Sequence, residues 1–121
     1  MIYTTFTDKR GIRIIKLLVD QIVFHNYDEV FKKVKNAISE DDNLIVLDME
    51  KVSFMDSISM GMMVPLLLYT RRVGGELVVA NLCDNIKSLF AMLRLDRIIQ
   101  IKTTVAEASE ILAAMEGTPE E

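Results

Sequence analysis

The segment of this sequence with the clearest chemical potential is the pair Asp56-Ser57, which separates a short apolar run from the most apolar stretch of the chain. Either side chain can accept hydrogen bonds from the free N–H groups of a helix's first turn, so the pair indicates a helix start. A hydroxyl at that position is also open to phosphorylation. A phosphoryl group there would meet unpaired N–H groups and add roughly −1.5 to −2 charges without melting the helix. The pair is therefore either a helix cap alone or a charge-controlled binding switch.

The groups that most catalytic sites need are missing. Nucleophilic catalysis requires a nucleophile, a base and an orienting group, yet His25 and Cys83 are the only histidine and cysteine. We interpret His25 as a surface residue and Cys83 as a small packed hydrophobe. Neither a phosphate-binding loop nor a dinucleotide fingerprint is present, and a Cys/His zinc site cannot be assembled. We predict a protein that is not an enzyme and that holds no cofactor or metal.

Composition limits the classes of partner and the cellular compartment that we expect. A net charge of −4 argues against nucleic-acid binding, which needs an excess of Lys and Arg on one face. A single cysteine fits a reducing compartment. The longest nearly unbroken apolar stretch, residues 60–69, is half of the roughly 20 residues that a bilayer span needs, and Pro65 interrupts it. We expect a cytoplasmic protein without direct membrane insertion.

The elements that position Asp56 and Ser57 follow from hydrophobic periodicity. Strand patterns run over residues 2–7, 12–19, 44–47, 76–81 and 98–101. Helical patterns run over residues 27–38, 57–73, 84–93 and 104–115. Asn26, Asp84 and the Thr104–Glu107 capping box stand where helix caps are expected. Pro65 should bend the second helix.

Strands that alternate with helices imply a mostly parallel sheet with right-handed crossovers. The sequence has the length of one domain, about 100–150 residues. We therefore predict a single α/β domain over residues 1–116 with the order ββαβαβαβα. It has an N-terminal β-hairpin, four helices and a short acidic tail at residues 117–121.

The Asp-Ser-x-x-x-Gly turn resembles the signature of STAS domains, in particular the bacterial anti-sigma factor antagonists, whose turn reads Asp-Ser-(Ser/Thr)-Gly-Leu-Gly. Asp56 and Ser57 match its first two positions and Gly61 its last glycine. Met60 replaces the leucine, Ile58 the second Ser or Thr, and Ser59 the first glycine. The resemblance covers residues 12–115 and is strongest over 44–115, where the runs 44–48 and 74–81 look like two strands of the family.

The resemblance implies a partner-switching role in transcription regulation. The unphosphorylated protein would bind an anti-sigma factor, a serine kinase of the histidine-kinase-like ATPase fold, and so release a sigma factor. The kinase would phosphorylate Ser57 and break the complex, and a metal-dependent serine phosphatase would reset it. Ser59 is a second candidate acceptor. The partner-binding turn would comprise Asp56, Ile58, Ser59, Met60 and Gly61.

Further expectations concern the surface around the turn and the wider role of the domain. The loop over residues 20–26 should flank the same turn, because it too follows the end of a strand. We expect a monomer with exposed apolar side chains among Ile58, Met60, Met62 and Met63, which suit docking to a partner. One alternative is a STAS subunit of a signalling scaffold or transporter-associated complex, in which Ser57 only caps the helix. A weaker alternative is a small-ligand-binding domain.

Overall fold

The N-terminal strands form the predicted hairpin. A computed structural model describes residues 1–116, so the predicted acidic tail at 117–121 lies outside the described residues. Strand β1 (Tyr3–Thr7) pairs antiparallel with β2 (Arg13–Leu17). The Asp8 carboxylate closes the connection by accepting hydrogen bonds from the N–H groups of Arg10 and Ile12. Gly11 occupies a positive φ of 85°, which glycine adopts without steric strain.

The remaining long strands complete a mostly parallel sheet in the order β1-β2-β4-β6-β7. Strands β4 (Leu44–Asp48), β6 (Glu76–Ala80) and β7 (Gln100–Lys102) all run parallel to β2. Every residue of β6 is buried, as expected of a strand that is covered on both faces. The α/β fold with an N-terminal hairpin is therefore confirmed.

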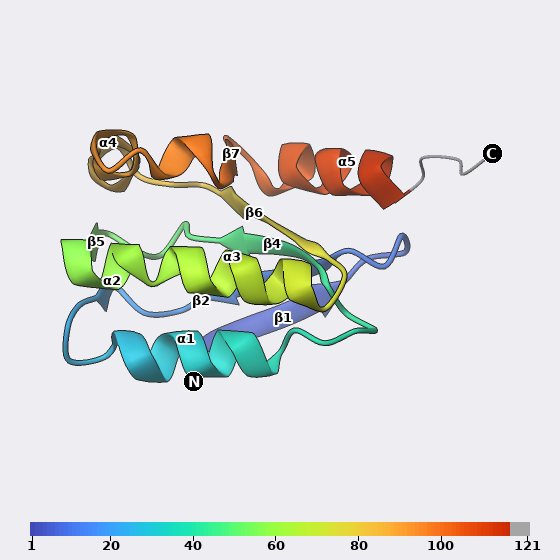
Figure 1. The fold of residues 1–121 in the computed structure, drawn as a ribbon, viewed down its shortest axis with the longest axis horizontal. Coiled ribbons are helices and arrows are strands. Elements are labelled where there is room, and N and C mark those ends of the chain that lie inside the picture. Colours follow the sequence, from blue (N-terminus) through green and yellow to red (C-terminus); the bar gives the residue numbers. More distant parts are fainter. Residues whose placement is uncertain (117–121) are drawn as a thin grey trace.

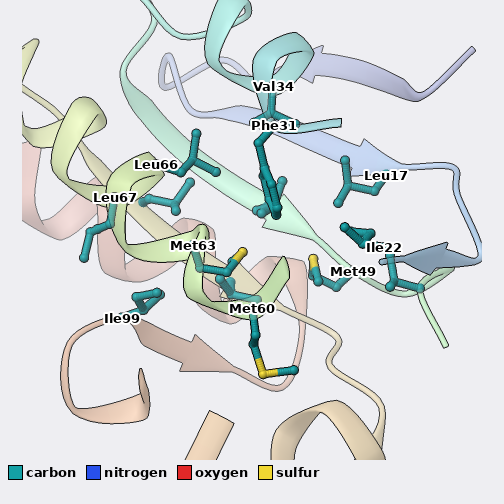
Figure 2. Packing of buried hydrophobic residues seen from close by; sticks show 14 of the residues in the cluster. Leu17, Ile22, Phe31, Val34, Met49, Met60, Met63, Leu66, Leu67 and Ile99 are labelled. Carbon is teal, nitrogen blue, oxygen red and sulfur yellow. The ribbon is translucent and has the colours of Figure 1, made fainter. Parts of the chain in front are cut away.

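Helices cover the two faces of this sheet unequally (Figure 1). Helices α1 (Tyr27–Asn36), α3 (Met63–Arg72) and α4 (Asp84–Met92) bury their apolar sides in the larger core cluster. Among the helices of residues 1–116, α5 (Val105–Glu116) is the one that packs on the other face, where Ala108 and Leu112 meet Val46 and Val78. Figure 2 shows side chains from α1 (Phe31, Val34) and from α3 (Met63, Leu66, Leu67) gathered in one layer.

The helix predicted over residues 57–73 is interrupted at one residue. It consists of α2 (Ser57–Gly61) and α3, joined at Met62. Pro65 explains the break, because a proline ring collides with the carbonyl group four residues earlier, here that of Gly61. The break places Pro65 in the first turn of α3. The N–H groups of a first turn have no partner within the helix, so the missing N–H of proline costs no hydrogen bond there.

Two strands of two residues were not predicted. Strand β3 (Gln21–Ile22) pairs in parallel with β5 (Phe54–Met55) to form a separate small sheet. Such short strands carry no readable period, and their pairing joins residues far apart in the chain. The small sheet holds together the two loops that lead into α1 and α2.

Several predicted helix and strand ends are corrected. The Asn26 side chain makes no cap bond to α1; instead it accepts from the Val23 N–H and donates to the Gln21 carbonyl. Cys83, not Asp84, occupies the cap position of α4. A turn of 3-10 helix, η1 (Leu95–Arg97), takes up the chain before β7, so the last strand begins at Gln100 rather than at residue 98.

The predicted capping box of α5 is confirmed in part. The Thr104 hydroxyl accepts from the Glu107 N–H at 3.1 Å, as such a box requires. The Glu107 carboxylate, however, accepts from the N–H of Thr103 rather than from that of Thr104.

Candidate functional site

The Asp56-Ser57 turn connects strand β5 to helix α2. It lies at the end of the molecule where α1 also begins (Figure 1). Both helices start there because each follows the carboxyl end of a parallel strand through a short β3 or β5 segment. In open α/β sheets this edge is where binding residues gather, since the connecting loops project from it.

Asp56 is the structural centre of the turn. Its Oδ1 atom accepts from the Ser59 N–H at 2.8 Å, which makes Asp56 the N-cap of α2. Its Oδ2 atom accepts from the Phe24 N–H, also at 2.8 Å. The Asp56 N–H donates to the Ile22 carbonyl. One residue therefore fixes both the start of α2 and the neighbouring loop.

These contacts favour the ionised carboxylate. The Ser59 hydroxyl and N–H lower the pKa of Asp56, and the Phe24 N–H and the charge of His25 act in the same direction. The hydroxyl acts by proximity, since Ser59 Oγ forms no hydrogen bond of regular geometry within residues 1–116. Asp56 thus carries its negative charge at neutral pH.

A second set of contacts joins the two loops beneath the turn. The Ser53 hydroxyl donates to the Asp20 carboxylate at 2.8 Å, and the Ser53 N–H donates to the Asp20 carbonyl at 2.8 Å. Together with Asp56, they seat the loop at residues 20–26 directly beside the turn. The structure therefore places this loop next to Ser57, as the sequence led us to expect.

Ser57, Ile58 and Gly61 are exposed on the outer side of the turn. Ser57 is the first residue of α2, and its hydroxyl makes no hydrogen bond within the described part of the chain. The Ile58 side chain is 60% exposed although it is fully apolar. This combination leaves a reactive hydroxyl beside an apolar contact surface.

Two residues predicted to bind the partner lie in the interior instead. Ser59 and Met60 have no exposed surface. Met60 belongs to the core cluster together with Met55 and Met63, and Figure 2 shows Met60 and Met63 among the buried side chains. In this conformation Ser59 is closed to a kinase, and Met60 supports the turn from beneath rather than contacting a partner.

Sequence reasoning missed Phe24 as a surface residue. Its side chain is 69% exposed, and its ring packs edge-on against His25 with ring centroids 5.3 Å apart. A phenylalanine in a loop, outside any helical or strand period, was the available signal. Phe24 and Ile58 lie on the two segments that Asp56 ties together.

Asp48 is a structural carboxylate at the end of β4. It is almost fully buried and accepts hydrogen bonds from the Glu50 N–H and the Asn81 side chain. Because its carboxylate makes these hydrogen bonds, Asp48 has a structural role at the edge of the sheet. Across residues 1–116 no group of three or more His, Cys, Asp and Glu side chains could hold a metal ion.

Comparison with protein-family models decides the family. The STAS domain model matches residues 4–108. The chain belongs to the STAS domain family. Within this family, it is 32% identical over 68 residues to a Thermotoga neapolitana protein, a homologue of TM1081 named as a candidate anti-sigma factor antagonist. That match covers 56% of this chain and 60% of the relative's length.

Solved structures of other STAS proteins share the fold. The candidate anti-sigma factor antagonist TM1081 from Thermotoga maritima has a TM-score of 0.77 at 22% identity, over 91% of this chain and 93% of that one. Phosphorylated SpoIIAA from Bacillus has a TM-score of 0.63 at 19% identity, over 90% of this chain and 98% of that one.

A transporter also contains this fold. The murine anion transporter Slc26a9 matches with a TM-score of 0.75 at 17% identity, over 86% of this chain but only 18% of that much longer one. No helix in residues 1–116 of the present chain combines the length and apolar character that crossing a membrane requires.

Proposed function

We propose that this STAS domain is an anti-sigma factor antagonist whose binding is switched off by phosphorylation of Ser57. The observation that carries the proposal is the placement of Ser57 as an exposed, unbonded hydroxyl between the apolar Ile58 and the Asp56 cap. The name of the Thermotoga neapolitana relative and the existence of a phosphorylated SpoIIAA support it.

The switch acts through charge rather than through a change of fold. Asp56 is ionised, so phosphorylation of Ser57 concentrates three or so negative charges on two adjacent residues. A partner that covers Ile58 and Phe24 would have to strip water from this cluster, and an unpaired buried charge costs several kcal/mol. Each 1.4 kcal/mol is a tenfold change in Kd, so a thousandfold loss of affinity is within reach.

In this proposal the chain is a binding protein and not an enzyme. The partner is an anti-sigma factor that is itself a serine kinase of the histidine-kinase-like ATPase fold and supplies ATP. A metal-dependent serine phosphatase removes the phosphate. The protein acts in the cytoplasm as a monomer, with Ser57, Ile58 and Gly61 as its contact turn and Asp56 as the residue that holds the turn in place.

Phosphate transfer tests this assignment. The purified protein is incubated with ATP and a lysate of its source organism, beside Ser57→Ala and Ser59→Ala variants, and the modified peptide is mapped by mass spectrometry. We expect Ser57→Ala to abolish the modification and Ser59→Ala to leave it intact, because the Ser59 hydroxyl is buried. Modification that persists in Ser57→Ala, or none in a lysate that phosphorylates other proteins, would refute it.

The likeness to the transporter supports a second candidate, a STAS subunit that does not switch. The fold matches 18% of the Slc26a9 chain, so STAS domains also serve as parts of larger membrane proteins. In that role Ser57 would be a cap and contact residue only. Stoichiometric co-purification with membrane or multi-subunit material, unaffected by Ser57→Asp, would favour this candidate over the switch.

A further inference from the structure

A groove runs between the parallel helices α1 and α3, beside the turn but distinct from it. Its apolar part is formed by Phe31 of α1 together with Met62, Pro65 and Leu66. The groove encloses about 230 Å³. Helix α1 begins at the end of the molecule that carries Ser57, and α3 follows α2 directly from that end (Figure 1).

Lysines edge this groove on the α1 side. Lys32 and Lys35 line it together with Asp28. The ion pair between Lys32 and Asp28 spans 3.2 Å, but both side chains are about 70% exposed, and such pairs hold their partners weakly. Lys35 lies over the Tyr69 ring at 4.7 Å, which fixes its position at the rim.

The α2–α3 side of the groove is free of negative charge. Residues 57–73 contain no carboxylate, and their only charged side chains are Arg71 and Arg72 at the far end. The charged side chains that line the groove are Lys32, Lys35 and Asp28. Arg71 is instead paired with Glu76 at 2.7 Å, and Lys33 lines a different pocket beside Tyr3. The groove lining thus carries one net positive charge on a protein whose net charge is −4.

Exposed apolar side chains occur on the helices that carry one wall of the groove. Pro65 and Leu68, three residues apart on α3, are both exposed, and Leu68 is 51% exposed. Ile58 on α2 is also exposed. Single exposed apolar residues are common, but Pro65 is itself part of the groove lining.

We propose that this groove binds an acidic amphipathic helix of a protein partner. A helix laid along α1 and α3 would insert apolar residues at i, i+3, i+4 and i+7 into the floor and place carboxylates against Lys32 and Lys35. The groove lining on α1 runs from Asp28 to Lys35, about two helical turns or about 11 Å. The net negative charge of the remaining surface repels an acidic partner elsewhere, so the groove also sets its orientation. This interaction needs no phosphate on Ser57.

Methionine methyl groups report on this proposal directly. The whole protein is labelled with ¹³C-methyl methionine, and two synthetic helical peptides of about 14 residues are titrated in. One carries leucines at i, i+3, i+4 and i+7 with glutamates at the positions that flank this stripe, and the second replaces each glutamate with lysine. We expect the acidic peptide to shift the Met62 signal while Met92, exposed on α4, stays unchanged. The basic peptide should leave both unchanged.

Charge reversal supplies the matched control. Lys32→Glu combined with Lys35→Glu should weaken the acidic peptide at least about fivefold, whereas Lys9→Glu in the distant hairpin turn should not. A Met62 signal that ignores the acidic peptide, or that moves equally with the basic one, overturns the proposal. Movement with protein concentration alone would assign the groove to a second copy, and movement with anionic vesicles but not peptide would assign it to a membrane surface. Both results would also overturn it.

Discussion

The carboxylate of Asp56 binds two segments at once: its own helix through the Ser59 N–H, and the Phe24 N–H that lies 32 residues earlier in the chain. Each bond is 2.8 Å long. The pairing of β3 with β5 joins the same two segments a few residues upstream. The contact turn and the loop at residues 20–26 are therefore joined both by a side chain and by strand pairing.

Removing this carboxylate should loosen both segments together. Asp56→Ala deletes the N-cap of α2 and the acceptor for Phe24, so we expect the melting temperature to fall by several degrees. Asp56→Asn keeps an acceptor oxygen, so its melting temperature should fall less than that of Asp56→Ala. Asp84→Ala is the matched control, because Asp84 is exposed and is not the cap of α4. An Asp56→Ala protein as stable as the wild type would contradict the two-bond role.

The charge on Asp56 also gives the domain a pH dependence. The folded protein lowers the pKa of Asp56 below its ordinary value of 3.8, so the unfolded chain binds its proton first as the pH falls. The contribution is fully present above pH 3.8 and is lost as the pH drops below it. The stability gap between wild type and Asp56→Asn should narrow from pH 6 to pH 3 in urea titrations. A stability difference that widens in acid would contradict a lowered pKa of Asp56 in the folded protein.

A substitution at Gly61 should affect partner binding but not stability. A Cβ at Gly61 would meet no atom within 4 Å, and its φ is not positive, so the fold does not require glycine there. We expect Gly61→Ala to leave stability unchanged or raised by up to about 1 kcal/mol, while partner binding falls because the turn gains bulk.

Gly75→Ala provides the contrast in the same assays. A Cβ at Gly75 would overlap the Asn43 carbonyl, so this variant should be strongly destabilised in urea unfolding. If Gly61→Ala binds the anti-sigma factor as well as the wild type does, Gly61 plays no part in the interface.

Pro65 should contribute little to the free energy of unfolding, in either direction. It occupies the first turn of α3, so Pro65→Ala should change the free energy of unfolding by no more than about 1 kcal/mol. Leu68→Pro, three residues further into the same helix and also exposed, should cost about 3 kcal/mol or more. Equal losses for the two variants in urea titrations would show that the break at Met62 has another cause.

Much of the fold could be predicted because its main elements are encoded locally. The runs at Leu44–Leu47 and Leu77–Ala80 are apolar throughout, which marks strands buried on both faces, and the structure has them at the centre of the sheet. The helical period beginning at Tyr27 likewise produced α1. Asp56-Ser57 signalled a helix start, and Asp56 is the cap.

The remaining features depend on contacts that no local pattern records. The pairing of Gln21 with Phe54 is set by where β2 and β4 end in space. The burial of Ser59 and Met60 reflects the packing of α2 on the core, where Met60 joins Met55 and Met63. The exposure of Phe24 depends on the bond that Asp56 makes to its backbone. Sequence periodicity reports the face of a regular helix, not the outcome of such tertiary contacts.

The central claim is that negative charge at Ser57 releases the partner. The kinase is isolated from the lysate with the unphosphorylated protein as bait. It is titrated by calorimetry against wild type, Ser57→Asp and Ser57→Asn, the last two nearly equal in size but different in charge. We predict that Ser57→Asp weakens binding at least about tenfold, or 1.4 kcal/mol, relative to Ser57→Asn, which stays close to the wild type. Equal affinity of the Asp and Asn variants for this partner would contradict the account.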